Sequence, residues 1–290
     1  MTDNMTYVGE IQRDQRNKGA KQNRHFKAEA RRALFASDNF YKAVISHLIC
    51  GAMCGGFLYI TYYTPDLFDM YFSALIGEKA AGLLTNTFNA VMYALFALVF
   101  MVFFAGVYTL AARMRETPDS EPGAVGYSSL SAMLDPISGF RNFRRTIVIT
   151  LILTVELAVV AAPAVVVFIF ADGTGMNGTL LFLLKAATVI PTAFICLFFI
   201  FLLVPMPYVT DNDPGIGAFA AYKKSASAAL CGIWRCYGLL FSFIPLILLS
   251  ALTFGVLYFA YTVPYMTLSY AKAGEYLYTI ANTERNEENE

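Results

Sequence analysis

The chain has 290 residues, of which 57% are hydrophobic, 15% aromatic and only 14% charged, and its formal net charge is zero. Soluble globular domains carry roughly 25% charged residues. The composition therefore excludes an ordinary soluble protein, and the zero net charge excludes a global field that would attract nucleic acid. Long apolar runs separate the charged segments. Such runs are typical of membrane-spanning helices, because about 20 residues at about 1.5 Å each cross the hydrocarbon core.

The N-terminal region is polar and basic. We expect residues 1–24 to form a flexible segment. In residues 25–39, apolar side chains recur at helical spacing opposite Lys27 and two arginines, which predicts an amphipathic helix lying on the membrane surface. The alternative is a solvated helix that precedes the first span. Beside a span, this basic cluster favours anionic lipid headgroups over nucleic acid.

The first predicted span covers residues 41–63, and it starts too far along the chain for a cleavable signal peptide, so we expect an uncleaved helix. Small residues recur four apart within it and would let another helix approach closely; the candidate packing residues are Gly51, Gly55 and Gly56. We expect Pro65 to end this helix and a short surface helix to follow near residues 73–84.

The next three spans are predicted at residues 87–112, 146–170 and 180–207. A loop rich in Gly, Pro and Ser separates the first two of these. The turn at residues 172–178 matches the GxGxxG dinucleotide fingerprint literally. That fingerprint requires a strand–helix unit, whereas this turn joins two predicted spans, so we interpret it as a flexible turn.

The last part of the apolar region is too long for one span. We predict a tight turn at Gly255 that divides it into spans at residues 237–252 and 255–271. The alternative is one long helix followed by a surface helix. Before it, Asp213 and Pro214 have the pattern of an N-cap and first helical residue, which predicts a short interfacial helix from Pro214 to Leu230. An acidic tail, residues 281–290, ends the chain.

The sequence thus predicts an all-α fold, a polytopic transmembrane bundle of about six spans that forms one domain over residues 25–280, with short amphipathic interfacial helices. Lysine and arginine are concentrated at the N-terminus, in the central loop and after the fourth span. Cytoplasmic loops are enriched in these residues. We therefore expect a bacterial cell-membrane protein with a cytoplasmic N-terminus and, after six spans, a cytoplasmic C-terminus.

Glu156 is the strongest functional candidate, because a carboxylate inside a span is costly unless it is protonated, paired or hydrated. It could be a proton or cation site, with Lys185 as a partner, or it could make a structural hydrogen bond to a neighbouring helix. His47 in the first span has the same two interpretations, a packing residue or a relay group. Prolines interrupt four successive spans, which allows kinks that line a transport path but is also common in membrane helices: Pro163, Pro191, Pro245 and Pro264.

Other chemistry finds little support in the sequence. The five cysteines are odd in number and mostly lie in apolar runs, so we expect no disulfide framework, and Cys50 and Cys54 are interpreted as packing residues. The oxygens of Asp211 and Asn212 could ligate a cation with lipid phosphates, but a capped turn is the preferred interpretation. We expect no enzymatic activity, no catalytic residue, no cofactor and no metal site.

Several motifs of the second half resemble a family of bacterial integral membrane proteins catalogued as domain of unknown function family 975. They are Pro205-Met-Pro-Tyr-Val-Thr-Asp-Asn-Asp-Pro214, Tyr222-Lys-Lys-Ser225, Gly232-Ile-Trp234-Arg235, Leu252-Thr-Phe-Gly-Val256 and Val263-Pro-Tyr265. More loosely, Lys27-Ala-Glu-Ala-Arg31-Arg-Ala-Leu34 and Gly139-Phe140-Arg-Asn-Phe143-Arg resemble motifs before its first and third spans. The sequence departs from the family pattern at Pro245, where glycine is expected, and at Asp213, which is inserted.

The resemblance covers roughly residues 25–280 and implies a helical membrane fold and a bacterial plasma membrane. It implies structural importance for Asp211, Asn212, Pro214, Gly232, Trp234, Gly255, Pro264 and Tyr265. The family is distantly similar to the membrane domain of some glycerophosphodiester phosphodiesterases, whose catalytic barrel this chain lacks, so no such activity is implied. We expect a non-enzymatic accessory or scaffold protein whose partners are membrane lipids and possibly another membrane protein; the alternative is a small-solute or ion transporter that uses Glu156.

Overall fold

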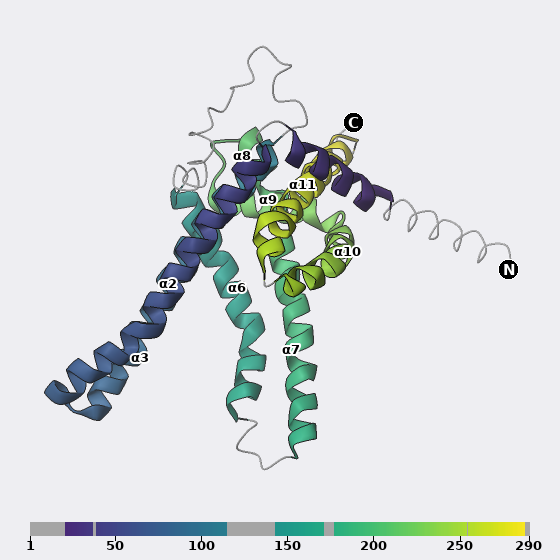
Figure 1. Cartoon of the computed structure of the whole chain (residues 1–290). Coiled ribbons are helices and arrows are strands. Elements are labelled where there is room, and N and C mark those ends of the chain that lie inside the picture. Colours follow the sequence, from purple (N-terminus) through teal and green to yellow (C-terminus); the bar gives the residue numbers. More distant parts are fainter. Residues whose placement is uncertain (1–20, 37–38, 115–142, 171–176, 254, 288–290) are drawn as a thin grey trace. The chain divides into compact units, whose positions relative to one another are not determined.

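The structure is a computed structural model, and it describes residues 21–36, 39–114, 143–170, 177–253 and 255–287 (Figure 1). Throughout these ranges the regular elements are helices and no strand occurs, which confirms the all-α prediction. The chain divides into two compact units. The first unit comprises residues 1–31, 148–248 and 266–290, and the second comprises residues 32–147 and 249–265.

Four helical stretches in the described part of the chain are long and apolar enough to cross a membrane. They are Asn39–Thr64, Arg144–Phe168, Gly178–Asn212 and Ile233–Leu252, and they overlap the predicted first, third, fourth and fifth spans. The predicted second span lies within α3 (Glu78–Arg113), whose stretch Phe100–Arg113 is a shorter apolar helix. The predicted sixth span lies in η3 (Tyr258–Thr262) and the start of α11 (Val263–Glu287). The second and sixth spans stay predictions.

In the second unit, α2 (Asn39–Ile76) packs along α3. Helix α2 continues through Pro65, so the predicted helix end at this proline and the surface helix predicted after it are wrong. The chain turns instead at Gly77, whose φ of 81° suits a residue without a Cβ. The hydroxyl of Thr64, the residue just before the proline, donates to the carbonyl of Ile60 one turn earlier.

The predicted tight turn at Gly255 is confirmed. Gly255 has a φ of 81°, and its amide donates to the carbonyl of Ser250 at 3.0 Å. The buried hydroxyls of Ser250 and Thr262 are 2.7 Å apart and join the two sides of the turn. Helix η3 follows as a π-helix that ends at Thr262, two residues before Pro264. The chain then continues as α11 to Glu287, well beyond the predicted span end at residue 271 and into the predicted acidic tail.

The first unit contains most of α6 (Phe143–Phe170), α7 (Gly178–Phe201), the short α8 (Met206–Asn212), α9 (Ala218–Leu230) and much of α10 (Ile233–Leu252) and α11. Two glycines allow very close packing in it. A Cβ on Gly232 would lie 2.5 Å from Leu277, and a Cβ on Gly274 would lie 2.4 Å from the carbonyl oxygen of Val204. The buried cluster around them is Phe201, Leu202, Val204, Ala229, Ile233, Cys236, Tyr237 and Leu277.

The connection between α8 and α9 differs from the prediction. We predicted that Asp213 caps a helix that starts at Pro214, but α9 starts at Ala218 with Gly217 as its N-cap. Asp213 ends α8 instead, with φ −135° and ψ 82°. A proline disfavours helical backbone in the residue before it, so the Asp–Pro pair terminates the preceding helix here.

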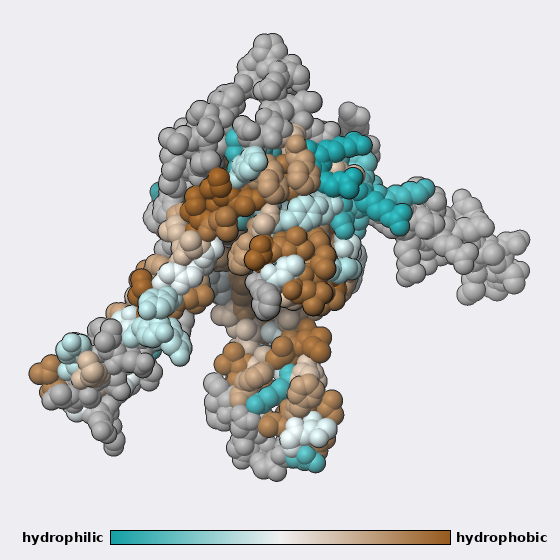
Figure 2. All heavy atoms as spheres, in the orientation of Figure 1, coloured by the Kyte–Doolittle hydropathy of each residue, from teal (hydrophilic) through white to brown (hydrophobic). Residues whose placement is uncertain are grey.

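The predicted amphipathic N-terminal helix is present over residues 21–35, so residues 21–24 already belong to it. Its apolar residues are buried in the protein, and its position on the membrane surface stays a prediction: Phe26, Ala30, Ala33 and Leu34. The ring of Phe26 lies 5.3 Å from that of Tyr276 in α11. Figure 2 shows hydrophilic side chains over this helix, whereas the parts of α6 and α7 near the turn between them are mostly hydrophobic.

The packing predicts a specific sensitivity at Gly274. We expect Gly274→Ala to lower the free energy of unfolding by about 1–3 kcal/mol, because the new methyl group meets a backbone oxygen that cannot move away easily. Unfolding of the purified full chain in detergent measures this. Gly178→Ala is the matched control, since a Cβ there meets nothing within 4 Å. Equal stability of the two variants would contradict the packing.

Candidate functional site

Glu156, which lies within a candidate membrane span, is hydrogen-bonded to a short helix. Glu156 lies half-buried on α6, and its Oε2 accepts a hydrogen bond from the hydroxyl of Tyr222 on α9 at 2.6 Å. This is a short hydrogen bond between a hydroxyl and a carboxyl oxygen. The pair therefore links the third predicted span to the helix that follows the fourth.

The electrostatics fix the direction of this bond. Burial, and then the Glu156 carboxylate, raise the pKa of the Tyr222 hydroxyl well above its usual value, so the hydroxyl stays protonated and donates. Helix α9 is held in place by a second buried bond, from the Ser225 hydroxyl to the carbonyl of Leu202 at 2.7 Å. That bond satisfies one of the carbonyls that the end of α7 leaves without a helical partner.

Lys185 is not brought to Glu156. Its ammonium lies 5.0 Å from the ring centroid of Phe168, near the end of α6. Phe168 is more than three helical turns beyond Glu156, about 18 Å along the axis. This position agrees with the expectation that Lys185 lies near the end of its span, and it leaves Tyr222 as the hydrogen-bond partner of Glu156.

His47 and the small-residue face belong to α2. His47 is buried, and its Nδ1 lies 2.7 Å from the carbonyl oxygen of Ala43 one turn earlier, a geometry in which Nδ1 donates. A Cβ on Gly51 would lie 3.4 Å from Phe259, whereas a Cβ on Gly55 or Gly56 would meet nothing within 4 Å. One end of the small-residue face therefore contacts η3 in the same unit.

The residues of the family-like motifs have different environments. Trp234 is 73% exposed, whereas Pro264 and Tyr265 are buried. Asp211, Asn212 and Pro214 are exposed, and the Asn212 amide donates to the carbonyl of Tyr208 at 2.8 Å. Among the described residues, no three His, Cys, Asp or Glu side chains lie close enough to hold a metal. Asp211 and Asn212 are the last two residues of α8.

A second polar cluster was not predicted. The Lys27 ammonium donates to the carbonyl of Ser242 on α10 at 3.2 Å, and burial lowers its pKa. The Arg235 guanidinium lies 4.9 Å from the ring centroid of Tyr276. The sequence signal for this cluster is weak, because Lys27 belongs to the charged face of its helix, which we expected to face headgroups. Tyr222 was also missed as the partner of Glu156, although it is the one large side chain among the small buried residues of α9.

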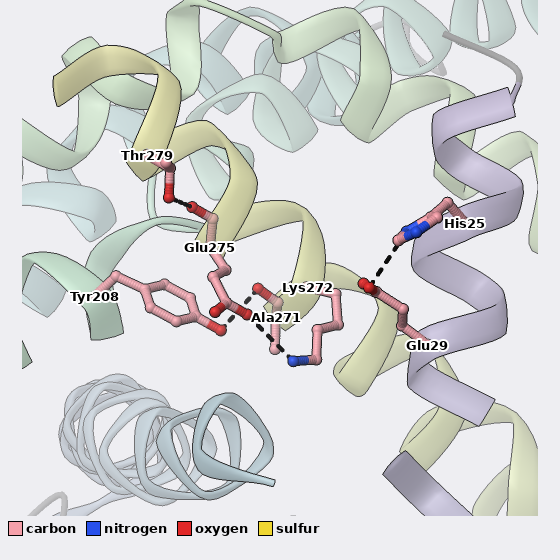
Figure 3. Close-up of polar contacts among 7 residues, drawn as sticks. All are labelled: His25, Glu29, Tyr208, Ala271, Lys272, Glu275 and Thr279. Atoms are coloured by element: carbon pink, nitrogen blue, oxygen red, sulfur yellow. Dashed lines mark hydrogen bonds and ion pairs between the residues drawn. The ribbon is translucent and has the colours of Figure 1, made fainter. Parts of the chain in front are cut away.

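Figure 3 shows further bonds of this kind. The Tyr208 hydroxyl donates to the carbonyl of Ala271 at 2.9 Å and joins α8 to α11, and Lys272 pairs with Glu275 on α11 at 3.2 Å. We call residues 21–31, α8, α9 and residues 266–287 the helical platform. Several of its polar side chains bond to one another or to neighbouring helix ends.

No protein-family model, no curated protein and no solved structure matches the chain. The resemblance to the bacterial membrane family stays a prediction, and the function is argued from the residues themselves.

The Glu156–Tyr222 bond predicts a stability effect. We expect Tyr222→Phe to lower the free energy of unfolding by about 1–3 kcal/mol, because it leaves a half-buried carboxylate oxygen without its donor. Glu156→Gln should cost less, since an amide oxygen still accepts the bond. Denaturant titration of the full chain in detergent, extended to the double variant, measures the coupling.

The control is Glu275→Gln, which removes an exposed ion pair and should cost under about 1 kcal/mol. A Tyr222→Phe variant as stable as the native chain would show that the hydroxyl does not hold α9 to α6.

Proposed function

We propose that the protein is a non-enzymatic accessory or scaffold protein of a bacterial cell membrane, with its helical platform on the cytoplasmic side. Four apolar helices provide the membrane anchor. The observation that carries the proposal is the engagement of Glu156 by Tyr222 at 2.6 Å. The carboxylate of Glu156 holds α9, a helix of the platform, in place. A protein that presents a stable surface requires helices that are fixed in this way.

The charge of the platform supports the cytoplasmic placement. Lys21, Arg24, Arg31 and Lys223 are exposed on it. Excess lysine and arginine beside spans favours the cytoplasmic side, and it attracts the anionic lipids of that leaflet. A basic outer surface over an internally bonded framework suits a protein that organises lipids or holds an acidic partner.

A carrier centred on Glu156 is the second candidate. It is favoured by the half-buried carboxylate within a membrane helix and by prolines inside three helices: Pro163, Pro191 and Pro245. Glu156→Gln separates the two functions in cells. A carrier should lose uptake or growth while its abundance is unchanged, whereas in a scaffold any phenotype should follow abundance.

Native mass spectrometry of the full chain, extracted gently from its own membrane, tests the accessory function. We expect a second protein or a defined set of lipids in stoichiometric amount. The Glu156→Gln and Tyr222→Phe variants should lose this companion in proportion to their loss of stability. A chain that carries only a discrete small solute would overturn the proposal and favour the carrier.

Cysteine labelling tests the orientation. Thr283 on α11 and Thr179 at the start of α7 are both exposed and give matched positions for Thr283→Cys and Thr179→Cys. In intact cells, a membrane-impermeant maleimide should label the cysteine at 179 and not that at 283, above the level of the native chain. The reverse pattern would place the platform outside.

A further inference from the structure

The first unit has an exposed surface that is both apolar and basic. Helix α9 buries one side, formed by small residues and Tyr222, and exposes the other. On the exposed side, Phe219 and Leu230 are 70% and 56% exposed. At about 100° per residue, Phe219, Lys223 and Leu230 fall within one stripe about 40° wide. An exposed stripe on a soluble helix would be polar, so water is a poor match for this one.

A second exposed apolar stripe lies on α10, which follows α9 after a short turn. Trp234 is 73% exposed near the start of this apolar helix. Phe241 and Leu248 are also exposed, and they follow Trp234 by two and four helical turns, on the same stripe. Trp234 thus heads a continuous apolar stripe on a helix that is long enough to cross the membrane. Tryptophan is enriched at this position, where hydrocarbon meets headgroups.

Lys223 indicates what kind of molecule binds the exposed stripe of α9. Lys223 is exposed between Phe219 and Leu230 on the stripe. In a protein–protein contact, its ammonium would lose water in the middle of an apolar face. At a bilayer surface, the aliphatic stem can lie along the acyl region while the ammonium reaches phosphates. The mixture of large apolar residues and lysine on one face is typical of helices that lie in the lipid interface.

We propose that Phe219, Lys223, Leu230 and Trp234 form a binding surface for anionic phospholipid headgroups, with the three apolar side chains inserted at glycerol depth. We call these residues the α9–α10 corner. The surface is independent of the accessory function and stands even if no partner protein is found.

The full chain contains a single tryptophan, so its emission reports on the corner alone. We would reconstitute it in phosphatidylcholine vesicles whose lipids carry bromine either near the glycerol or deep in the acyl chain. Strong quenching by the shallow bromines and weak quenching by the deep ones is expected. Stronger quenching by the deep bromines, or none by either, would overturn the proposal, since the corner would then lie in the core or be covered by protein.

The headgroup preference is tested with brominated phosphatidylglycerol diluted in phosphatidylcholine. We expect quenching of Trp234 beyond the mole fraction of the brominated lipid, and Lys223→Gln should reduce this enrichment by up to about fivefold. Lys272→Gln removes the same charge from a lysine that already pairs with Glu275 at 3.2 Å, and it should leave the enrichment unchanged. Equal behaviour of the two variants would refute a headgroup site at Lys223.

Discussion

A polar group inside a bilayer must find its partner within the protein, because the hydrocarbon supplies none. The Glu156–Tyr222 bond is the clearest case in this chain, and much of the first unit depends on it. The carboxylate requires a donor from outside its own helix, so α9 must approach α6. That approach is possible because α9 buries mainly alanines and a serine beside Tyr222. The serine, Ser225, in turn satisfies the carbonyl of Leu202 where α7 ends.

The same constraint governs the irregular backbone of the second unit. Pro65 lacks an amide, yet α2 continues through it, and the hydroxyl of the neighbouring Thr64 is bonded to the carbonyl of Ile60. At Gly255 the chain reverses, and the amide of this glycine and the hydroxyls of Ser250 and Thr262 close the turn. The π-helix before Pro264 keeps its backbone bonded, with the amide of Val263 donating to the carbonyl of Tyr258. In each case the chain is helical both before and after the irregular point.

The same constraint explains which predictions from the sequence are confirmed and which are wrong. The length of the apolar runs was enough to predict the stretches in α2, α6, α7 and α10, because membrane crossing depends mainly on hydrophobicity. The rules for soluble helices predicted that Pro65 ends a helix and that Asp213 caps one. Helix α2 instead continues through Pro65, and Asp213, which precedes Pro214, ends α8. The partner of Glu156 lies 66 positions away in the sequence. No local pattern encodes such a pairing, and the expected partner, Lys185, was chosen on charge alone.

Several internal polar groups pair with one another, as at Glu156, Ser225 and Ser250, whereas the exposed surface is left to interact with the surroundings. The apolar side of the N-terminal helix is buried in the protein, so its exposed cations lie on a helix that packs against the rest of the unit. On α9 the division is the opposite of that in a soluble helix: small residues face inward, and Phe219 and Leu230 face outward. Small residues make the internal contacts of α9, whereas its large apolar side chains are exposed. These exposed side chains are therefore available to bind something outside the unit. For a protein anchored by apolar helices, those interactions lie with lipids or with a neighbour in the plane of the membrane.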